Sequence, residues 1–145
     1  MTALPRLAPL AAALIGPLLA AAAAQAAACS ADPAAVEAAI ARLEPRYGAV
    51  LSDISCDAPT LPAQVLMCDA ALGPDPLLWR MGRLDDLAWV YAVENATGQQ
   101  IDLAAPPRDG DFIARRDACG DAACLCAQLI GHTNDSLDGE SPYPQ

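Results

Sequence analysis

The sequence predicts a small all-α protein, a disulfide-stapled bundle of about four to five short helices. Apolar residues recur at helical spacing in several segments, whereas no segment of useful length alternates as a strand does. Two Asp-Pro pairs, at positions 32–33 and 75–76, put a capping side chain before a proline that suits the first helical turn. Six cysteines and few aromatic residues indicate that cross-links supplement a modest core.

The first 28 residues have the features of a secretory signal peptide. Arg6 is their single charge, and the Ala- and Leu-rich run that follows it ends in small residues. The triplets at positions 24–26 and 26–28 both fit an A-x-A cleavage pattern. A retained membrane anchor is the alternative, but prolines and Gly16 interrupt the run and no basic flank follows it. We therefore expect cleavage and export, to the periplasm or to the medium.

Cleavage immediately before Cys29 would also suit a lipoprotein, in which the new N-terminal cysteine carries the lipid that anchors the protein to the envelope. Lipoprotein signals usually carry a leucine or another branched residue three positions before the cysteine, where this chain has Ala26. Lipidation would also leave one of the other cysteines without a partner. We expect an unlipidated protein, with no membrane contact unless Cys29 is lipidated.

The remainder of the chain is strongly acidic. Removing 28 of the 145 residues leaves 117, enough for one domain. All 18 acidic residues lie in this part, against seven arginines and no lysine, so its formal charge is −11. Such a surface repels nucleic acid and anionic lipid and attracts cationic proteins. An acidic surface that serves only solubility is the alternative.

The first predicted helix belongs to an N-terminal extension, residues 29–53. It begins after Asp32 and ends at Gly48, and Pro45 in its last turn is expected to keep it short. Its apolar face is formed by residues at helical spacing: Val36, Ile40, Leu43 and Tyr47.

A loop over Asp53–Thr60 leads to the second predicted helix, which Pro62 opens and Gly73 ends. The longest helix follows Asp75-Pro76 and extends to Thr97-Gly98. Its apolar face carries Leu77, Met81, Leu84, Ala88 and Tyr91.

Residues 101–109 are predicted to be a loop because they contain Pro106-Pro107. A fourth helix is predicted over Phe112–Cys119, and Asp121 can cap a fifth that includes Leu129 and Ile130. Residues 138–145, rich in Pro, Ser and acidic residues, are expected to form a disordered tail.

Several motifs in residues 54–137 occur in a recognisable order. Cys56 and Cys68 stand twelve residues apart, Leu87–Tyr91 fits a Leu-x-x-Leu-Tyr helix, and Phe112–Cys119 falls on a Trp-Leu-x-x-Arg-Asp-x-Cys element followed by Cys124. This order resembles the small extracytoplasmic domain family named for the N-terminal part of the lysozyme inhibitor LprI. The resemblance implies an exported helical domain that binds or inhibits a lysozyme-type enzyme.

The six cysteines are interpreted as a disulfide framework, since an exported chain meets an oxidising compartment. Their spacing favours two local bonds, Cys56–Cys68 and Cys119–Cys124, and the family resemblance implies the same two pairs. Cys29 and Cys126 have no counterpart in the family pattern and are expected to bond to each other. Fifteen pairings are formally possible for six cysteines.

A metal site formed by Cys119, Cys124, Cys126 and His132 is the rival hypothesis. The C-x4-C-x-C-x5-H spacing is not a standard zinc pattern, and export would oxidise the thiols, so we expect neither metal nor other cofactor. His132 is the single histidine and is interpreted as an ordinary polar residue. With no Gly-x-Ser-x-Gly turn either, we expect no enzymatic activity. Arg116-Asp117 is interpreted as a structural ion pair.

The residues and the resemblance together predict a binding protein with a cationic partner, in particular a basic cell-wall hydrolase of lysozyme type. The loops over residues 53–60 and 98–111 are the candidate contacts. The alternative is an envelope domain with a structural or interaction role and no inhibitory activity.

Overall fold

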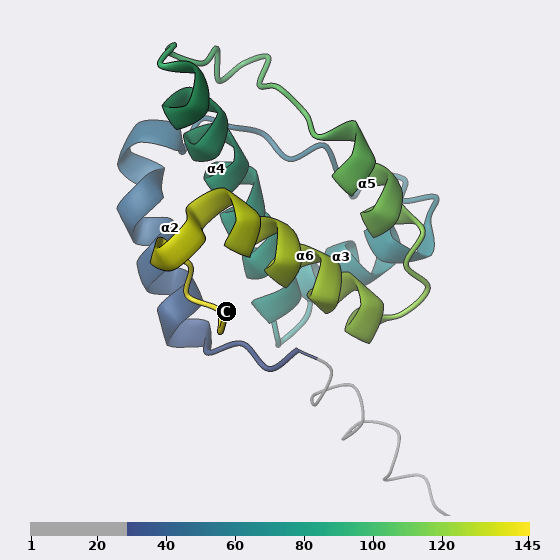
Figure 1. Ribbon diagram of the computed structural model, residues 1–145. Helices are drawn as coiled ribbons and strands as arrows, with labels where there is room; N and C mark the ends of the chain where they lie inside the picture. Colours follow the sequence, from purple (N-terminus) through teal and green to yellow (C-terminus); the bar gives the residue numbers. More distant parts are fainter. Residues whose placement is uncertain (1–28) are drawn as a thin grey trace, which may run out of the picture.

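The computed structural model describes residues 29–145, so the predicted leader lies outside the described residues (Figure 1). Within this range all regular structure is helical and no strand occurs, which confirms the all-α prediction. No helix in the described part combines the length and the apolar character needed to cross a bilayer. The elements are α2 (Pro33–Tyr47), α3 (Pro62–Leu72), α4 (Leu77–Thr97), α5 (Gly110–Asp117), α6 (Ala122–Leu137) and the short 3-10 helix η1 (Asp138–Glu140).

Helix α4 is the centre of the bundle. It packs against α2, α3 and α6, which lie around it in Figure 1. Because neighbours surround it, apolar side chains are buried on most of its circumference. The fully buried ones are Met81, Leu84, Leu87, Ala88 and Val90.

Helix α2 begins and ends where the sequence predicts. The side chain of Asp32 accepts a hydrogen bond from the Ala34 backbone N–H at 2.9 Å. The helix spans 15 residues and ends at Tyr47 with Gly48 as its C-cap, as predicted, but Pro45 does not shorten it. A proline in the last turn costs only one hydrogen bond, and burial of the Tyr47 ring in the core favours completion of that turn.

The other helix starts follow local signals closely. Helix α3 begins at Pro62, and the Leu77 N–H at the start of α4 donates to Asp75 Oδ1 at 3.1 Å. Helix α5 begins two residues before the predicted start because Asp109 accepts hydrogen bonds from the next turn. Gly98 ends α4 in the left-handed conformation, with φ of 63°, which favours glycine.

Three disulfide bonds join Cys29 to Cys126, Cys56 to Cys68, and Cys119 to Cys124. These are the pairs that the sequence analysis preferred. The first attaches the segment before α2 to α6, the second attaches the loop before α3 to that helix, and the third spans the turn between α5 and α6. All three therefore connect segments that would otherwise separate when the bundle opens.

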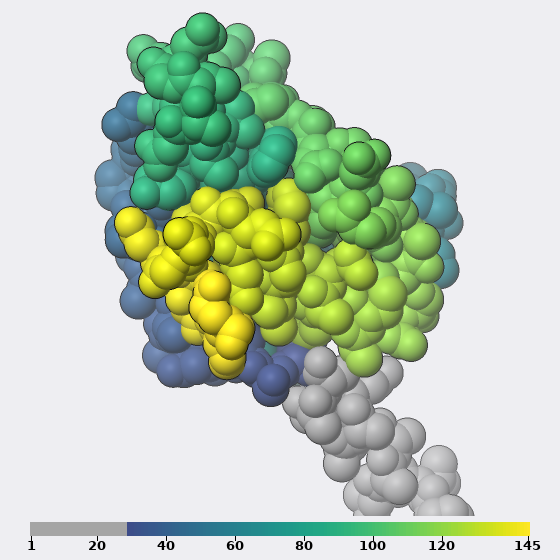
Figure 2. All heavy atoms as spheres, viewed as in Figure 1, coloured from purple at the N-terminus to yellow at the C-terminus, as the bar shows by residue number. Residues whose placement is uncertain are grey.

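The C-terminal residues are ordered, in contrast to the predicted disordered tail. They lie against the body of the molecule beside α6 (Figure 2). The Tyr143 side chain is 3 % exposed, Asn134 of α6 donates to the Pro144 carbonyl at 3.1 Å, and Glu140 forms an ion pair with Arg42 of α2. Burial of one aromatic ring thus orders a segment whose polar composition indicated disorder.

Replacing Asp121 by alanine tests the cap of α6. The Asp121 side chain accepts a hydrogen bond from the Cys124 N–H at 2.8 Å, so Asp121→Ala should lower the free energy of unfolding by about 1 kcal/mol in urea denaturation. The matched control is Asp135→Ala, an exposed acidic residue of the same helix that caps nothing. A loss of equal size in the control would contradict the capping role.

Candidate functional site

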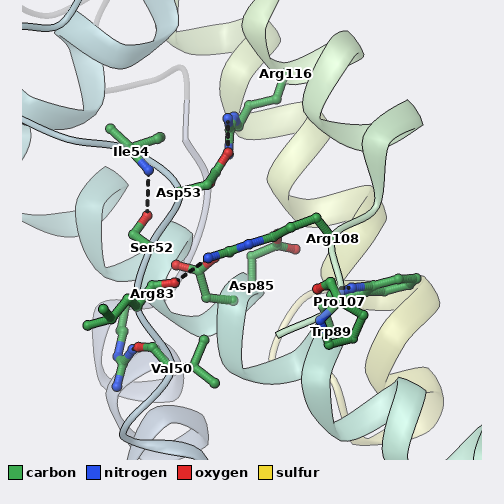
Figure 3. Close-up of polar contacts among 12 residues, drawn as sticks. Val50, Ser52, Asp53, Ile54, Arg83, Asp85, Trp89, Pro107, Arg108 and Arg116 are labelled. Atoms are coloured by element: carbon green, nitrogen blue, oxygen red, sulfur yellow. Dashed lines mark hydrogen bonds and ion pairs between the residues drawn. The ribbon is translucent and has the colours of Figure 1, made fainter. Parts of the chain in front are cut away.

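The two connecting segments that were expected to contact a partner lie side by side, between α2 and α3 and between α4 and α5 (Figure 3). Arg108 joins them, because its Nη2 donates to the Leu51 carbonyl at 2.7 Å. The second segment is also attached to α4, where Trp89 Nε1 donates to the Pro107 carbonyl at 3.1 Å. Backbone carbonyls of both segments therefore accept hydrogen bonds from side chains of this chain.

Arg116 of α5 is buried and fully paired. Its Nη1 and Nη2 donate to the two carboxylate oxygens of Asp53, both at 2.8 Å, and its Nε donates to Asp117 Oδ1 at 2.9 Å. The predicted ion pair with Asp117 is present, and Asp53 is a further partner that local sequence did not indicate. Burial favours the neutral form of each group, but this pairing raises the pKa of Arg116 and lowers that of Asp53. The pair ties α5 to the segment before α3.

His132 is a buried, paired residue and not the ordinary polar residue that was expected. Its Nδ1 lies 2.9 and 3.1 Å from the two carboxylate oxygens of Asp85, and its Nε2 lies 3.4 Å from Asp109 Oδ2. Its ring stacks on Phe112 with 3.9 Å between centroids and 4° between planes. His132 therefore connects α6 to α4 and to the start of α5.

Asp85 and His132 form one coupled titrating pair. Burial lowers the pKa of His132, but its hydrogen bond with Asp85 and the charges of Asp85 and Asp109 raise it above the ordinary value overall. Burial also raises the pKa of Asp85, against the hydrogen bonds from His132 and Thr133. The two directions agree once the groups are treated as one titrating pair, because both mean that the pair keeps its proton to higher pH.

The neighbouring carboxyl group, Asp86, is also protonated more readily than usual. Burial raises its pKa to about 7, and the charges of Asp85 and Asp53 act in the same direction. Arg108, whose Nη1 lies 3.4 Å from Asp86 Oδ1, opposes the rise only in part. The site therefore holds protons that would be released in an unfolded chain at neutral pH.

These groups line one pocket, which has room for about one water molecule (≈ 20 Å³). Its walls are formed by Asp53, Asp85, Asp86, Trp89, Arg108, Asp109, Phe112, Ile113, Arg116 and His132. Their contacts hold α5 and two connecting segments against α4 and α6. The pocket has the dimensions of a structural polar cluster, without space for an organic ligand.

The rival metal set is not assembled. Cys119, Cys124 and Cys126 all belong to disulfides, and the ring nitrogens of His132 face carboxylates. Within residues 29–145, no group of three or more His, Cys, Asp or Glu side chains is arranged to hold a metal ion.

Sequence reasoning missed Asp85 and His132 as a pair, although both stand at apolar positions. Asp85 follows Met81 by four residues on the buried face of α4, and His132 continues the helical spacing of Leu125 and Leu129 on α6. A charged residue on a buried helix face requires a partner. The position of Asp85 on a buried face thus indicates that it has a partner, but the sequence does not identify that partner.

The exterior of the described part carries an excess of negative charge. Six of its seven arginines form ion pairs with carboxylates, and only Arg115 is exposed without one. Of the 18 acidic residues, seven pair with arginine and two with His132, which leaves nine. All nine are exposed: Asp32, Asp57, Asp69, Asp75, Asp102, Asp111, Asp121, Asp135 and Asp138.

Comparisons of the chain with protein-family models, curated proteins and solved structures find no match. The resemblance to the LprI-type domain therefore stays a prediction that rests on the motifs in residues 54–137. The fold and the charge distribution are independent of it.

Proposed function

We propose that this is an exported, non-enzymatic binding protein whose partner is a strongly basic protein, and that a lysozyme-type cell-wall hydrolase is the partner it inhibits. The carrying observation is the excess of exposed carboxylates that lack an ion pair. Nine exposed carboxylates have no cationic partner within residues 29–145, whereas six of the seven arginines in this range pair with a carboxylate of the same chain. A surface of this kind steers a basic protein into encounter and repels acidic ones.

The disulfides support the exported part of the proposal. All six cysteines of the chain are paired, and such bonds form and persist in oxidising compartments. A binding surface on a cross-linked scaffold also loses little conformational entropy when a partner docks.

The polar cluster around His132 supports a structural role for the two connecting segments. Arg108 and Arg116 direct their guanidinium groups to Leu51 and Asp53 of this same chain. A hydrolase cleft that holds two carboxylates would need donors from an inhibitor. Both arginines already donate hydrogen bonds within the chain. We therefore propose that the protein binds the basic surface around such a cleft and does not contact the two carboxylates in it.

A cell-wall lysis assay with a basic lysozyme tests the proposal. Added protein should suppress lysis at low ionic strength, and the inhibition should weaken steeply between about 0.01 and about 1 M salt, where the screening length falls from about 30 to about 3 Å. Asp102→Asn/Asp135→Asn/Asp138→Asn should weaken binding, since it removes three exposed charges. Asp86→Asn, at a largely buried carboxyl group, is the matched control and should not.

Two results would contradict the proposal. No inhibition at a large molar excess in low salt would exclude lysozyme as the target. Binding that is insensitive to salt would exclude charge as its basis and would favour the alternative, an envelope interaction domain.

A further inference from the structure

Helix α3 is apolar on nearly all sides, and although it packs against α4, α5 and α6, part of its surface is exposed. Among its 11 residues, Asp69 is the single charged one, and the buried residues are Ala63, Met67 and Cys68. A helix that is hydrophobic all round is normally buried all round. The outward side of α3 is therefore apolar, although no other element of the described part covers it.

Three large aliphatic residues form a stripe on this outward side, which we call the α3 stripe: Leu61, Val65 and Leu72, with exposed fractions of 37 %, 39 % and 85 %. Separations of four and seven residues place them on one face of the helix and its N-cap. Leu51 is the remaining large hydrophobic residue exposed in residues 29–145, so three of the four lie on this face. Apolar side chains exposed on one face favour an interaction there.

Three carboxylates without ion pairs lie close to the α3 stripe in sequence. Asp69 lies four residues after Val65 and three before Leu72, and is thus a direct neighbour of both on the helix surface. Asp57 follows Cys56, which is bonded to Cys68 of α3, and Asp75 follows the helix. No arginine occurs between positions 47 and 79. The charged residues nearest to the stripe in sequence are therefore all acidic.

The helix that carries the stripe is fixed in place. The Cys56–Cys68 bond attaches it to the preceding loop, and Met67 is buried against Gly82 of α4, where no larger residue would leave space for the methionine side chain. Thr60 N–H donates to Gln64 Oε1 at 3.2 Å in the first turn. The stripe is therefore presented in a preorganised form, which favours binding.

We infer that the α3 stripe is the docking surface for the cationic partner, an inference that rests on the proposed function. The partner surface that it fits has aliphatic or aromatic side chains at its centre and lysine or arginine around them. Contact between the aliphatic groups excludes water, and the basic groups reach Asp57, Asp69 and Asp75. Charge brings the partner to the protein, and the stripe determines where it docks.

Two probes test the inference, both by isothermal titration calorimetry: a basic lysozyme, and a synthetic helical peptide of leucine and lysine with one apolar face. Val65→Ser/Leu72→Ser should weaken binding of either probe by about tenfold or more. Asp69→Asn should weaken it less, and mainly at low salt. Leu51→Ser is the matched control, since that residue is equally apolar and 70 % exposed but lies outside α3. Because the changed side chains are exposed, circular dichroism and thermal unfolding should stay as in the wild type.

The outcomes separate the inference from the proposed function. If lysozyme binds all variants equally, the α3 stripe is not the docking surface and the proposed function stands. If the stripe variants lose the peptide but the wild type does not bind lysozyme, the docking surface stands and lysozyme is the wrong partner. If the wild type binds neither probe, both are contradicted. A wild-type dimer in sedimentation that Val65→Ser/Leu72→Ser abolishes would make the stripe a self-interface and overturn the inference.

Discussion

Cys29→Ala/Cys126→Ala should lower the free energy of unfolding by about 4 to 5 kcal/mol, more than the loss of either other disulfide. The bond spans 97 residues, whereas Cys56–Cys68 and Cys119–Cys124 span 12 and 5. Loop-closure entropy grows with the logarithm of this separation and gives about 3 and about 2 kcal/mol for the two shorter loops. The long bond therefore restricts the unfolded chain most.

Urea denaturation of the three double variants measures this order. Cys119→Ala/Cys124→Ala is the control, since it removes a bond without freeing the segment before α2. A larger loss in the control than in Cys29→Ala/Cys126→Ala would show that native packing, and not chain restriction, determines the contribution of each bond. Non-reducing peptide mapping of the exported protein adds an independent result. A lipidated Cys29 has no free thiol and cannot form a disulfide. Recovery of a peptide in which Cys29 is bonded to Cys126 would therefore exclude the lipid-anchored alternative.

The helices were predictable because their signals are local. Asp32, Pro62, Asp75 and Asp121 mark helix starts through hydrogen bonds or prolines within a few residues, and these starts agree with the structure to within about two residues. Gly48, Gly73 and Gly98 also mark the ends of α2, α3 and α4, as predicted. Two other expectations failed. Pro45 did not shorten α2, and the tail did not stay disordered, because in both places burial of a tyrosine ring outweighed the local tendency.

The polar cluster was not predictable in the same way. Its contacts join residues far apart in sequence: Asp85 with His132 across 47 positions, and Asp53 with Arg116 across 63. Composition and spacing can show that a charged residue stands on a buried face, but its partner depends on how α4, α5 and α6 pack. The charge of the exterior was predictable from composition, whereas the internal pairing of nearly all arginines required the fold.

Raising the pH from about 4 to about 8 should reduce the stability of the protein, because the folded state holds protons that the unfolded chain releases. Asp86 has an ordinary pKa near 3.9 when unfolded and a pKa of about 7 when folded. Between these two pKa values the folded state binds more protons than the unfolded chain. The stability that the raised pKa provides is therefore complete below about pH 4 and is lost as the pH rises through about 7. The Asp85–His132 pair extends the decline above the ordinary histidine pKa of about 6.5, because its pKa is also raised.

Other carboxylates determine how far the protein's stability falls at acidic pH. The pKa of Asp53 is lowered by Arg116 and that of Asp109 by backbone hydrogen bonds from α5, although burial opposes both shifts. Their contribution is present above the ordinary aspartate pKa of about 3.9 and is lost as the pH falls through their lowered values. The two opposite trends place maximum stability on the acidic side of neutrality.

Asp86→Asn should flatten the decline between pH 4 and pH 8, and it should make the protein more stable than the wild type at pH 8. One pKa unit corresponds to about 1.4 kcal/mol, so the gain from removing this ionisation amounts to as much as about 4 kcal/mol. Urea denaturation across this pH range measures it. Asp53→Asn is a control of opposite sign, because it breaks the pair with Arg116 and should destabilise the protein at pH 7 more than at pH 3. If Asp86→Asn leaves the pH dependence unchanged while His132→Gln removes it, the titration of the Asp85–His132 pair, and not of Asp86, accounts for the decline.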